Sequence, residues 1–194
     1  MAFAKFFRNL TACMLALWLT GCTSQSSEQE QVKFNRSEAV TARIKLAIAY
    51  LEQNDFPKAK QNIDKALEHD NQDYLPHSVL AYYYQQIGEN AKAQETFKTA
   101  ISLSEKLSET KQPRPDVLNN YGAFLCKQGE FDNAYQKFEQ ALQSQERYYN
   151  QADTLENIAL CAHQQHNQTK QNDAVAQLEK LEPKRANNLK VLLK

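Results

Sequence analysis

Cysteine and histidine side chains are the first candidates for chemistry in this chain of 194 residues. Cys161, His163 and His166 lie close together and could suggest a metal site. On a helix His163 and His166 would share a face, but Cys161 would not lie on it. A structural zinc site also needs four ligands, and no complete set is visible. We therefore favour a surface histidine pair and predict no metal site.

Other kinds of reactive site also lack their motifs. No G-x-S-x-G nucleophile elbow accompanies the histidines, and the four glycines form no phosphate-binding loop. Lys plus Arg and Asp plus Glu are 23 each, which argues against a basic surface for nucleic acid. We predict that the chain is not an enzyme, takes no cofactor, and binds neither nucleic acid nor a small-molecule substrate.

The N-terminal residues have the pattern of an export signal. Lys5 and Arg8 form a positive flank, and a short apolar run from 10 to 19 follows them. The segment Leu19-Thr20-Gly21-Cys22 resembles a bacterial lipobox. This resemblance implies that 1–21 is a lipoprotein signal peptide, that Cys22 is lipidated, and that the protein is anchored in the membrane through this lipid. By the same resemblance, Thr23 in place of an aspartate implies the outer membrane. Thr23 does not decide the orientation, and we expect the protein to face the periplasm.

Residues 22–36 have no apolar periodicity after the cysteine and are predicted to be a flexible tether. Beyond them, 37–194 contains few glycines and prolines and is expected to be all-α. Of the cysteines in this part, Cys126 and Cys161 would lie on neighbouring helices. A disulfide between them is conceivable, but free buried cysteines are the preferred interpretation.

A period of 34 residues runs through this part of the chain and resembles the tetratricopeptide repeat, in which two helices form a hairpin. The repeats are expected at about 40–73, 74–107, 115–148 and 152–185, with an insertion at 108–114. Small residues recur at positions 8, 20 and 27, where closely crossing helices leave no room for larger side chains. They are Ala47, Ala59 and Ala66, then Ala81, Ala93 and Ala100, then Gly122, Ala134 and Ala141.

Turn residues and the fourth repeat complete the pattern. Asn54, Gly88 and Gly129 occupy equivalent turns. The fourth repeat is less regular: Ala174 and Leu178 are assigned to its second helix after three extra residues in the turn, and Leu181 replaces the expected small residue at position 27. An unrelated helical bundle is the alternative, but nine small residues in register argue against it.

A groove along the first helices of the repeats is the expected binding site. Positions 2, 5, 9, 12 and 13 should face this groove, and the apolar residues among them indicate a surface for a partner. Two interpretations stay open for the first repeat: its apolar residues bind a partner, or the segment around Val32 and Phe34 covers them. The groove residues predicted on this basis are Ile44, Ile48, Leu51, Tyr82 and Asn119.

The third repeat carries a closer resemblance. Its run 117–125, Val-Leu-Asn-Asn-Tyr-Gly-Ala-Phe-Leu, and the later 156–160, Glu-Asn-Ile-Ala-Leu, resemble type IV pilus pilotin lipoproteins of the PilF/PilW family. This resemblance implies an outer-membrane lipoprotein that binds the type IV pilus secretin subunit and assists its localisation and multimerisation. The alternative is a general periplasmic interaction scaffold for envelope or cell-wall complexes.

Overall fold

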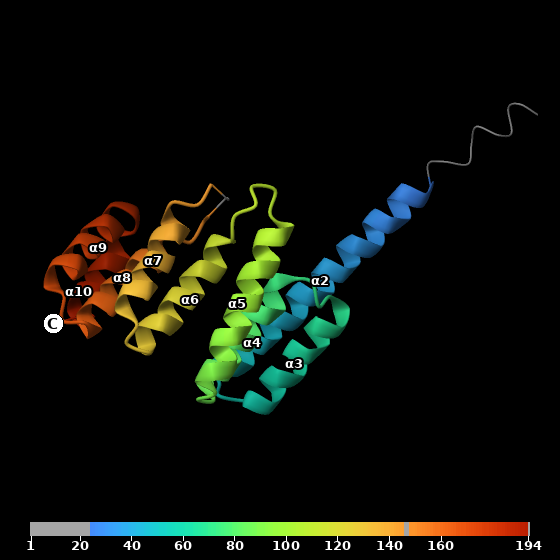
Figure 1. Ribbon diagram of the computed structural model, residues 1–194, viewed down its shortest axis with the longest axis horizontal. Helices are drawn as coiled ribbons and strands as arrows, with labels where there is room; N and C mark the ends of the chain where they lie inside the picture. The colour runs from blue at the N-terminus through green and yellow to red at the C-terminus, as the bar shows by residue number, and fades with distance from the viewer. Residues whose placement is uncertain (1–23, 146–147, 194) are drawn as a thin grey trace, which may run out of the picture. The chain divides into compact units, whose positions relative to one another are not determined.

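The computed structural model describes residues 24–145 and 148–193, and within these ranges all regular structure is helical (Figure 1). The helices are α2 (Ser24–Glu52), α3 (Phe56–His69), α4 (Tyr74–Gln86), α5 (Asn90–Leu107), α6 (Pro115–Lys127), α7 (Phe131–Leu142), α8 (Gln151–Gln164), α9 (Gln168–Leu181) and α10 (Pro183–Leu192). This confirms the all-α prediction. Among the described helices, none has the length and apolar character needed to cross a membrane.

The chain divides into two units, Met1–Ala39 and Val40–Lys194. Of the first unit, residues 24–39 are described, and they form the beginning of α2. The predicted tether therefore differs from the structure, because residues 24–36 are helical. Glutamate and glutamine, which recur in this segment, are good helix formers even without an apolar face. Cys22 and the predicted signal peptide lie outside the described residues.

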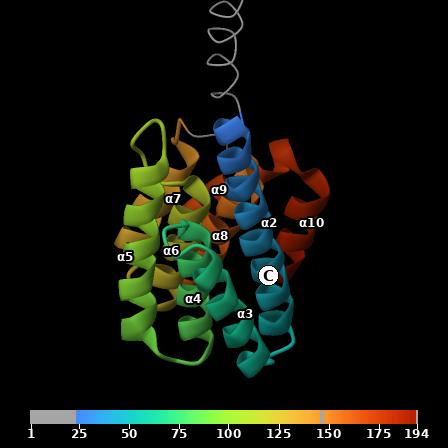
Figure 2. The same cartoon turned by 90° about the vertical axis from the view of Figure 1, so that its right-hand side faces the viewer.

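The second unit is a series of helical hairpins of the tetratricopeptide type, as predicted. The closest packing joins α4 to α5, α6 to α7 and α8 to α9, and α4, α6 and α8 also contact one another in turn. Figure 2 looks along this series, with α5 and α7 beside the first helices α4 and α6. All nine predicted small residues are buried where the helices cross.

Gly122 shows why these positions must be small. A Cβ atom added there would lie 2.7 Å from Cε1 of Phe138 and 3.1 Å from the carbonyl oxygen of Ala134. Both neighbours belong to α7, and Phe138 is fully buried in the core. Any side chain at this position would therefore push α6 and α7 apart.

The turns within the hairpins are equivalent in all four repeats. Gly88 and Gly129 both have φ of 80°, and Asn54 has φ of 58° at the corresponding place. His166, with φ of 59°, has this role in the fourth repeat. Glycine adopts this left-handed conformation readily, and asparagine is among the residues that tolerate it. The turn assignments made from the sequence for the first three repeats are confirmed.

The assignment of the second helix in the fourth repeat is corrected. His166 lies at position 15 and α9 begins at position 17, as in the other repeats, so no extra residues lengthen the turn. Position 20 is therefore Gln171 and position 27 is Leu178, and both are buried. Leu181, predicted to occupy position 27, is exposed. The prediction had assigned Ala174 to position 20, which placed the register of this helix three residues too late.

A further helix, α10, which the sequence analysis had not predicted, follows the fourth repeat. Pro183 begins α10, and Ala186 and Leu189 pack into one cluster with residues of α8 and α9. Arg185 binds the carboxylates of both Asp153 and Glu156 on α8. The sequence signals for this helix are Pro183 at its first position and the spacing of Ala186 and Leu189, and both are weak.

Candidate protein-binding groove

Contacts between successive first helices show which of the predicted groove residues are accessible. The Nδ2 of Asn120 on α6 lies 3.4 Å from Oγ of Ser78 on α4. In the next interface, Asn157 on α8 donates to Oδ1 of Asn119 on α6 at 3.0 Å. Both contacts join position 5 of one repeat to position 6 of the next. Position 5 therefore faces the neighbouring first helix and not the groove.

Three of the five predicted groove residues are consequently misplaced. Ile44 and Leu51 are only 2% and 4% exposed and pack with Val79 of α4 in the first core cluster. Asn119 is buried as well. These residues occupy positions 5 and 12, the side of each first helix that meets the next repeat. The interpretation that Ile44 and Leu51 bind a partner in the groove does not hold, because they pack within their own repeat and against α4.

The same packing between first helices brings two cysteines together. Cys126 on α6 forms a disulfide with Cys161 on α8, with 5.8 Å between their Cα atoms. The preferred interpretation of free thiols is thus wrong, and the bridge that had been left open is present. The bond uses Cys161, so this residue is not free to join His163 and His166 as a metal ligand. Among the described residues there is no group of three or more His, Cys, Asp or Glu arranged to hold a metal ion.

Apolar side chains recur at position 9 of the first helices. Ile48 of α2, Tyr82 of α4 and Leu160 of α8 are 38%, 39% and 37% exposed, and Ala123 of α6 is half-buried between them in the series. We call these four residues the apolar row. Ile48 and Tyr82 were predicted to face the groove, and their exposure is compatible with that, whereas Leu160 was missed because the fourth repeat looked irregular.

The neighbouring tyrosines of α4 behave differently from Tyr82. Tyr83 packs edge-on against Phe56 of the first repeat, with 6.4 Å between the ring centroids. Tyr84 packs against the core cluster of the second and third repeats. The Tyr82–Tyr84 run is therefore not a continuous aromatic platform, and only Tyr82 is exposed.

Polar contacts fix the start of α4 against the start of α6. Tyr74 donates from its hydroxyl to Oδ2 of Asp116 at 3.1 Å, and Arg114 lies 3.7 Å from the other oxygen of that carboxylate. Burial raises the pKa of Tyr74 to about 12, and the negative charge of Asp116 adds to the effect. Tyr74 therefore stays protonated and able to donate at neutral pH.

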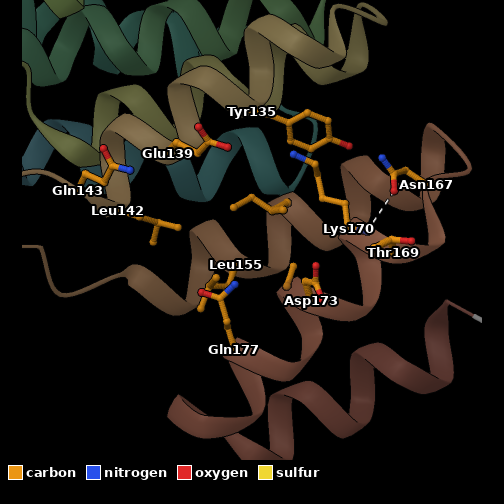
Figure 3. Close-up of a pocket in the computed structure, with 12 residues that line it drawn as sticks. Tyr135, Glu139, Leu142, Gln143, Leu155, Asn167, Thr169, Lys170, Asp173 and Gln177 are labelled. Atoms are coloured by element: carbon orange, nitrogen blue, oxygen red, sulfur yellow. Dashed lines mark hydrogen bonds between the residues drawn. The ribbon is translucent and has the colours of Figure 1, made fainter.

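A hollow lies between α7 and α9, with α8 as its floor (Figure 3). Its volume is about 670 Å³, and Leu142 and Leu155 contribute apolar surface. The ammonium group of Lys170 lies 4.0 Å from the centroid of the Tyr135 ring, a cation–π contact across one end. The Tyr135 hydroxyl donates to Oε1 of Gln165 at 2.9 Å. These contacts tie α7 to the fourth repeat and leave the hollow open.

A family model described as the coatomer epsilon subunit matches residues 85–191, which is 107 of the 194 residues. The match begins at the end of α4 and reaches α10, so it covers the greater part of the repeats. The chain belongs to this family. In this repeat protein the matched segment consists of the stacked hairpins described above.

Individual relatives connect the repeat protein to type IV pilus proteins. An uncharacterised protein of Haemophilus influenzae is 41% identical over 92% of this chain and 93% of its own length. The type IV pilus assembly protein PilF of Pseudomonas aeruginosa is 35% identical over 76% of this chain. Only 56% of that PilF is covered, so the chain corresponds to little more than half of it.

Solved structures of type IV pilus proteins resemble the repeat protein in fold. That of Pseudomonas aeruginosa PilF is 29% identical over 77% of this chain and 64% of its own, with a TM-score of 0.65. PilW, whose structure is described as that of a widely conserved type IV pilus biogenesis factor, is 26% identical over 74% of this chain and 62% of its own, with a TM-score of 0.62. The repeat protein thus shares its tetratricopeptide fold with PilF and PilW.

Proposed function

We propose that the repeat protein is an outer-membrane lipoprotein of type IV pilus biogenesis that binds the secretin subunit through the groove of its first helices. The observation that carries this proposal is the apolar row, which exposes Ile48, Tyr82 and Leu160 at the same position on three of the four first helices of a PilF-like solenoid. Exposed apolar side chains at equivalent positions are typical of a protein interaction site. Binding needs no covalent chemistry, so the proposed role is non-enzymatic.

Two further features support the proposed location. The sequence around Cys22 resembles a lipobox, and lipidation there would attach the protein to the membrane. The Cys126–Cys161 disulfide supports an oxidising compartment, because such bonds are rare in the reducing cytosol. We propose that the protein faces the periplasm, where it would meet secretin subunits before they assemble.

Deletion of the gene tests this function in the cell. We expect secretin multimers to disappear from the outer-membrane fraction and surface pili to be lost, with both restored by the wild-type gene. Unchanged multimers and normal pili in the deletion strain would contradict the proposal and favour a general envelope scaffold instead.

A further inference from the structure

Helix α10, which follows the fourth repeat (Figure 1), has one buried and one exposed side. Ala186 and Leu189 are buried against α8 and α9. Val191 and Leu192 are instead 70% and 71% exposed. Lys184, seven residues before Val191 and also exposed, lies on the same face of the helix. We call Lys184, Val191 and Leu192 the α10 face.

Ion pairs fix the direction in which the α10 face points. Arg185 binds the carboxylates of Asp153 and Glu156 on α8. Nζ of Lys190 lies 2.7 Å from Oε2 of Glu179 on α9. Together with the buried side of the helix, these contacts hold α10 on the fourth repeat. The α10 face is therefore presented outward by the tertiary structure.

Positive charge is concentrated around this face. Between residues 180 and 194 lysine and arginine number five and glutamate one, which gives this segment a net charge of +4. The whole chain has a net charge of zero, so the other 179 residues carry −4. Lys180 and Leu181, at the end of α9 just before α10, are both exposed. Exposed lysines next to exposed apolar side chains are typical of a helix that binds an anionic lipid surface.

We propose that α10 is a second membrane contact, which lies flat on an anionic lipid surface through the α10 face. Val191 and Leu192 would enter the boundary between headgroups and acyl chains, and Lys184 would reach the lipid phosphates along its flexible stem. Ten residues of helix rise about 15 Å, half the thickness of the hydrocarbon layer, so α10 lies on the membrane and does not cross it. This inference rests on the membrane location in the proposed function.

Charge and size favour a lipid surface over a second copy of the chain. A two-fold contact through the α10 face would set the lysines of the two copies against each other. A stable protein interface also buries about 1,000 Å² or more in total, which two apolar side chains and a lysine do not supply. A bilayer offers apolar depth beside negative phosphates and needs no complementary shape.

Vesicle binding tests the inference with residues 23–194, which include every residue that the structure describes and cannot carry the lipid. The probes are vesicles of phosphatidylethanolamine with phosphatidylglycerol, and neutral vesicles of phosphatidylcholine. We expect co-sedimentation with the anionic vesicles to be at least tenfold stronger than with the neutral ones. Raising the salt from about 50 to about 500 mM should weaken it at least tenfold, because exposed charges are then screened.

A tryptophan reporter locates the contact on α10. The chain's single tryptophan is Trp18, so residues 23–194 contain none. Leu192→Trp should shift its fluorescence to the blue when anionic vesicles are added, because the indole leaves water. Leu107→Trp, at a position on α5 that is 59% exposed, is the matched control and should show no shift.

Paired substitutions separate the apolar and the charged contribution. Val191→Ser with Leu192→Ser, and Lys180→Gln with Lys184→Gln, should each weaken binding to anionic vesicles at least tenfold. The matched controls are Leu107→Ser and Lys98→Gln, both at exposed positions on α5, and they should bind like the wild type. Thermal melts establish that every variant is folded.

Equal binding to both kinds of vesicle, or unchanged binding by the folded paired variants, would overturn the inference. So would a dimer in sedimentation that the serine variant dissociates, because a second copy would then cover the α10 face. Failure of the proposed function is distinguishable, since these measurements need neither the lipid on Cys22 nor a secretin. If vesicles are not bound but the wild type is lipidated and binds the secretin, only the membrane contact of α10 is refuted.

Discussion

Asn157 of α8 donates to Asn119 of α6 at 3.0 Å, and seven residues beyond Asn119 the same two helices are joined again by the Cys126–Cys161 disulfide. Seven residues are about two helical turns, so the third and fourth repeats are fixed to each other at two separate points. The amides and the apolar row of these repeats therefore lie on a rigid part of the solenoid. Such a fixed surface reduces the entropy that binding would cost.

Removing the disulfide should lower stability without abolishing the fold. A crosslink between residues 35 apart constrains the unfolded chain, and such bonds typically contribute about 2–4 kcal/mol. We expect the Cys126→Ala, Cys161→Ala double variant to melt about 5–15 °C lower by circular dichroism. Adding a reductant should lower the melting temperature of the wild type similarly but leave the double variant unchanged. Equal melting of wild type and variant would show that the bond does not form in the protein.

Gly122→Ala should be strongly destabilising, although alanine is the better helix former. The new Cβ would approach Phe138 to 2.7 Å, and overpacking of this kind costs about 1–3 kcal/mol. Urea denaturation measures the change in free energy of unfolding. Gln136→Ala, at an exposed position on α7, is the control and should lie within about 0.5 kcal/mol of the wild type. A Gly122→Ala variant as stable as that control would contradict the close crossing of α6 and α7.

Stability should fall in alkaline solution because of buried tyrosine. Burial raises the pKa of Tyr74 to about 12, above its ordinary value of 10.0, so the folded state favours the protonated hydroxyl. This contribution is complete below pH 10 and is lost as the pH rises toward 12. The melting temperature should therefore decrease between pH 9.5 and 11.5. Tyr74→Phe, which cannot ionise there, should show a smaller decrease, and an identical decrease would contradict the assignment to Tyr74.

Cys22→Ser tests the proposed anchor. Without a thiol the lipid cannot be attached, so the exported protein should appear in the soluble periplasmic fraction instead of the outer membrane. Fractionation followed by immunoblotting measures the distribution, and metabolic labelling with a fatty acid should mark the wild type only. If the variant stayed in the outer-membrane fraction, the lipid would not be what holds the protein there.

The repeat register was predictable because it depends on residue size alone. A small residue such as Ala59 or Gly122 is required where two helices cross closely, since a larger residue could not fit there. The groove was less predictable. Ile44 and Ile48 are both apolar and lie one turn apart, yet Ile44 is buried by α4 and Ile48 is exposed, and this difference depends on how the next repeat packs. The disulfide partner of Cys126 was unpredictable for the same reason, because it depends on the packing between first helices.

The predicted register of the fourth repeat was wrong for a different reason. Its positions 20 and 27 hold Gln171 and Leu178, so the size rule that worked elsewhere indicated the wrong register. The left-handed turn at His166 keeps the register of the other three repeats. Histidine is not among the residues that dominate turns, so the sequence did not indicate a turn there.

Binding of the purified secretin subunit to apolar-row variants tests the central claim most directly. Ile48→Asp and Tyr82→Asp place a charge at exposed positions of the row, so the fold should survive while the partner's apolar side chains are repelled. The control is Leu107→Asp at the end of α5, where the leucine is 59% exposed and lies outside the row. We predict that wild type and Leu107→Asp bind the subunit alike and that the two row variants bind at least tenfold more weakly. Equal affinity of all four folded proteins would contradict the account.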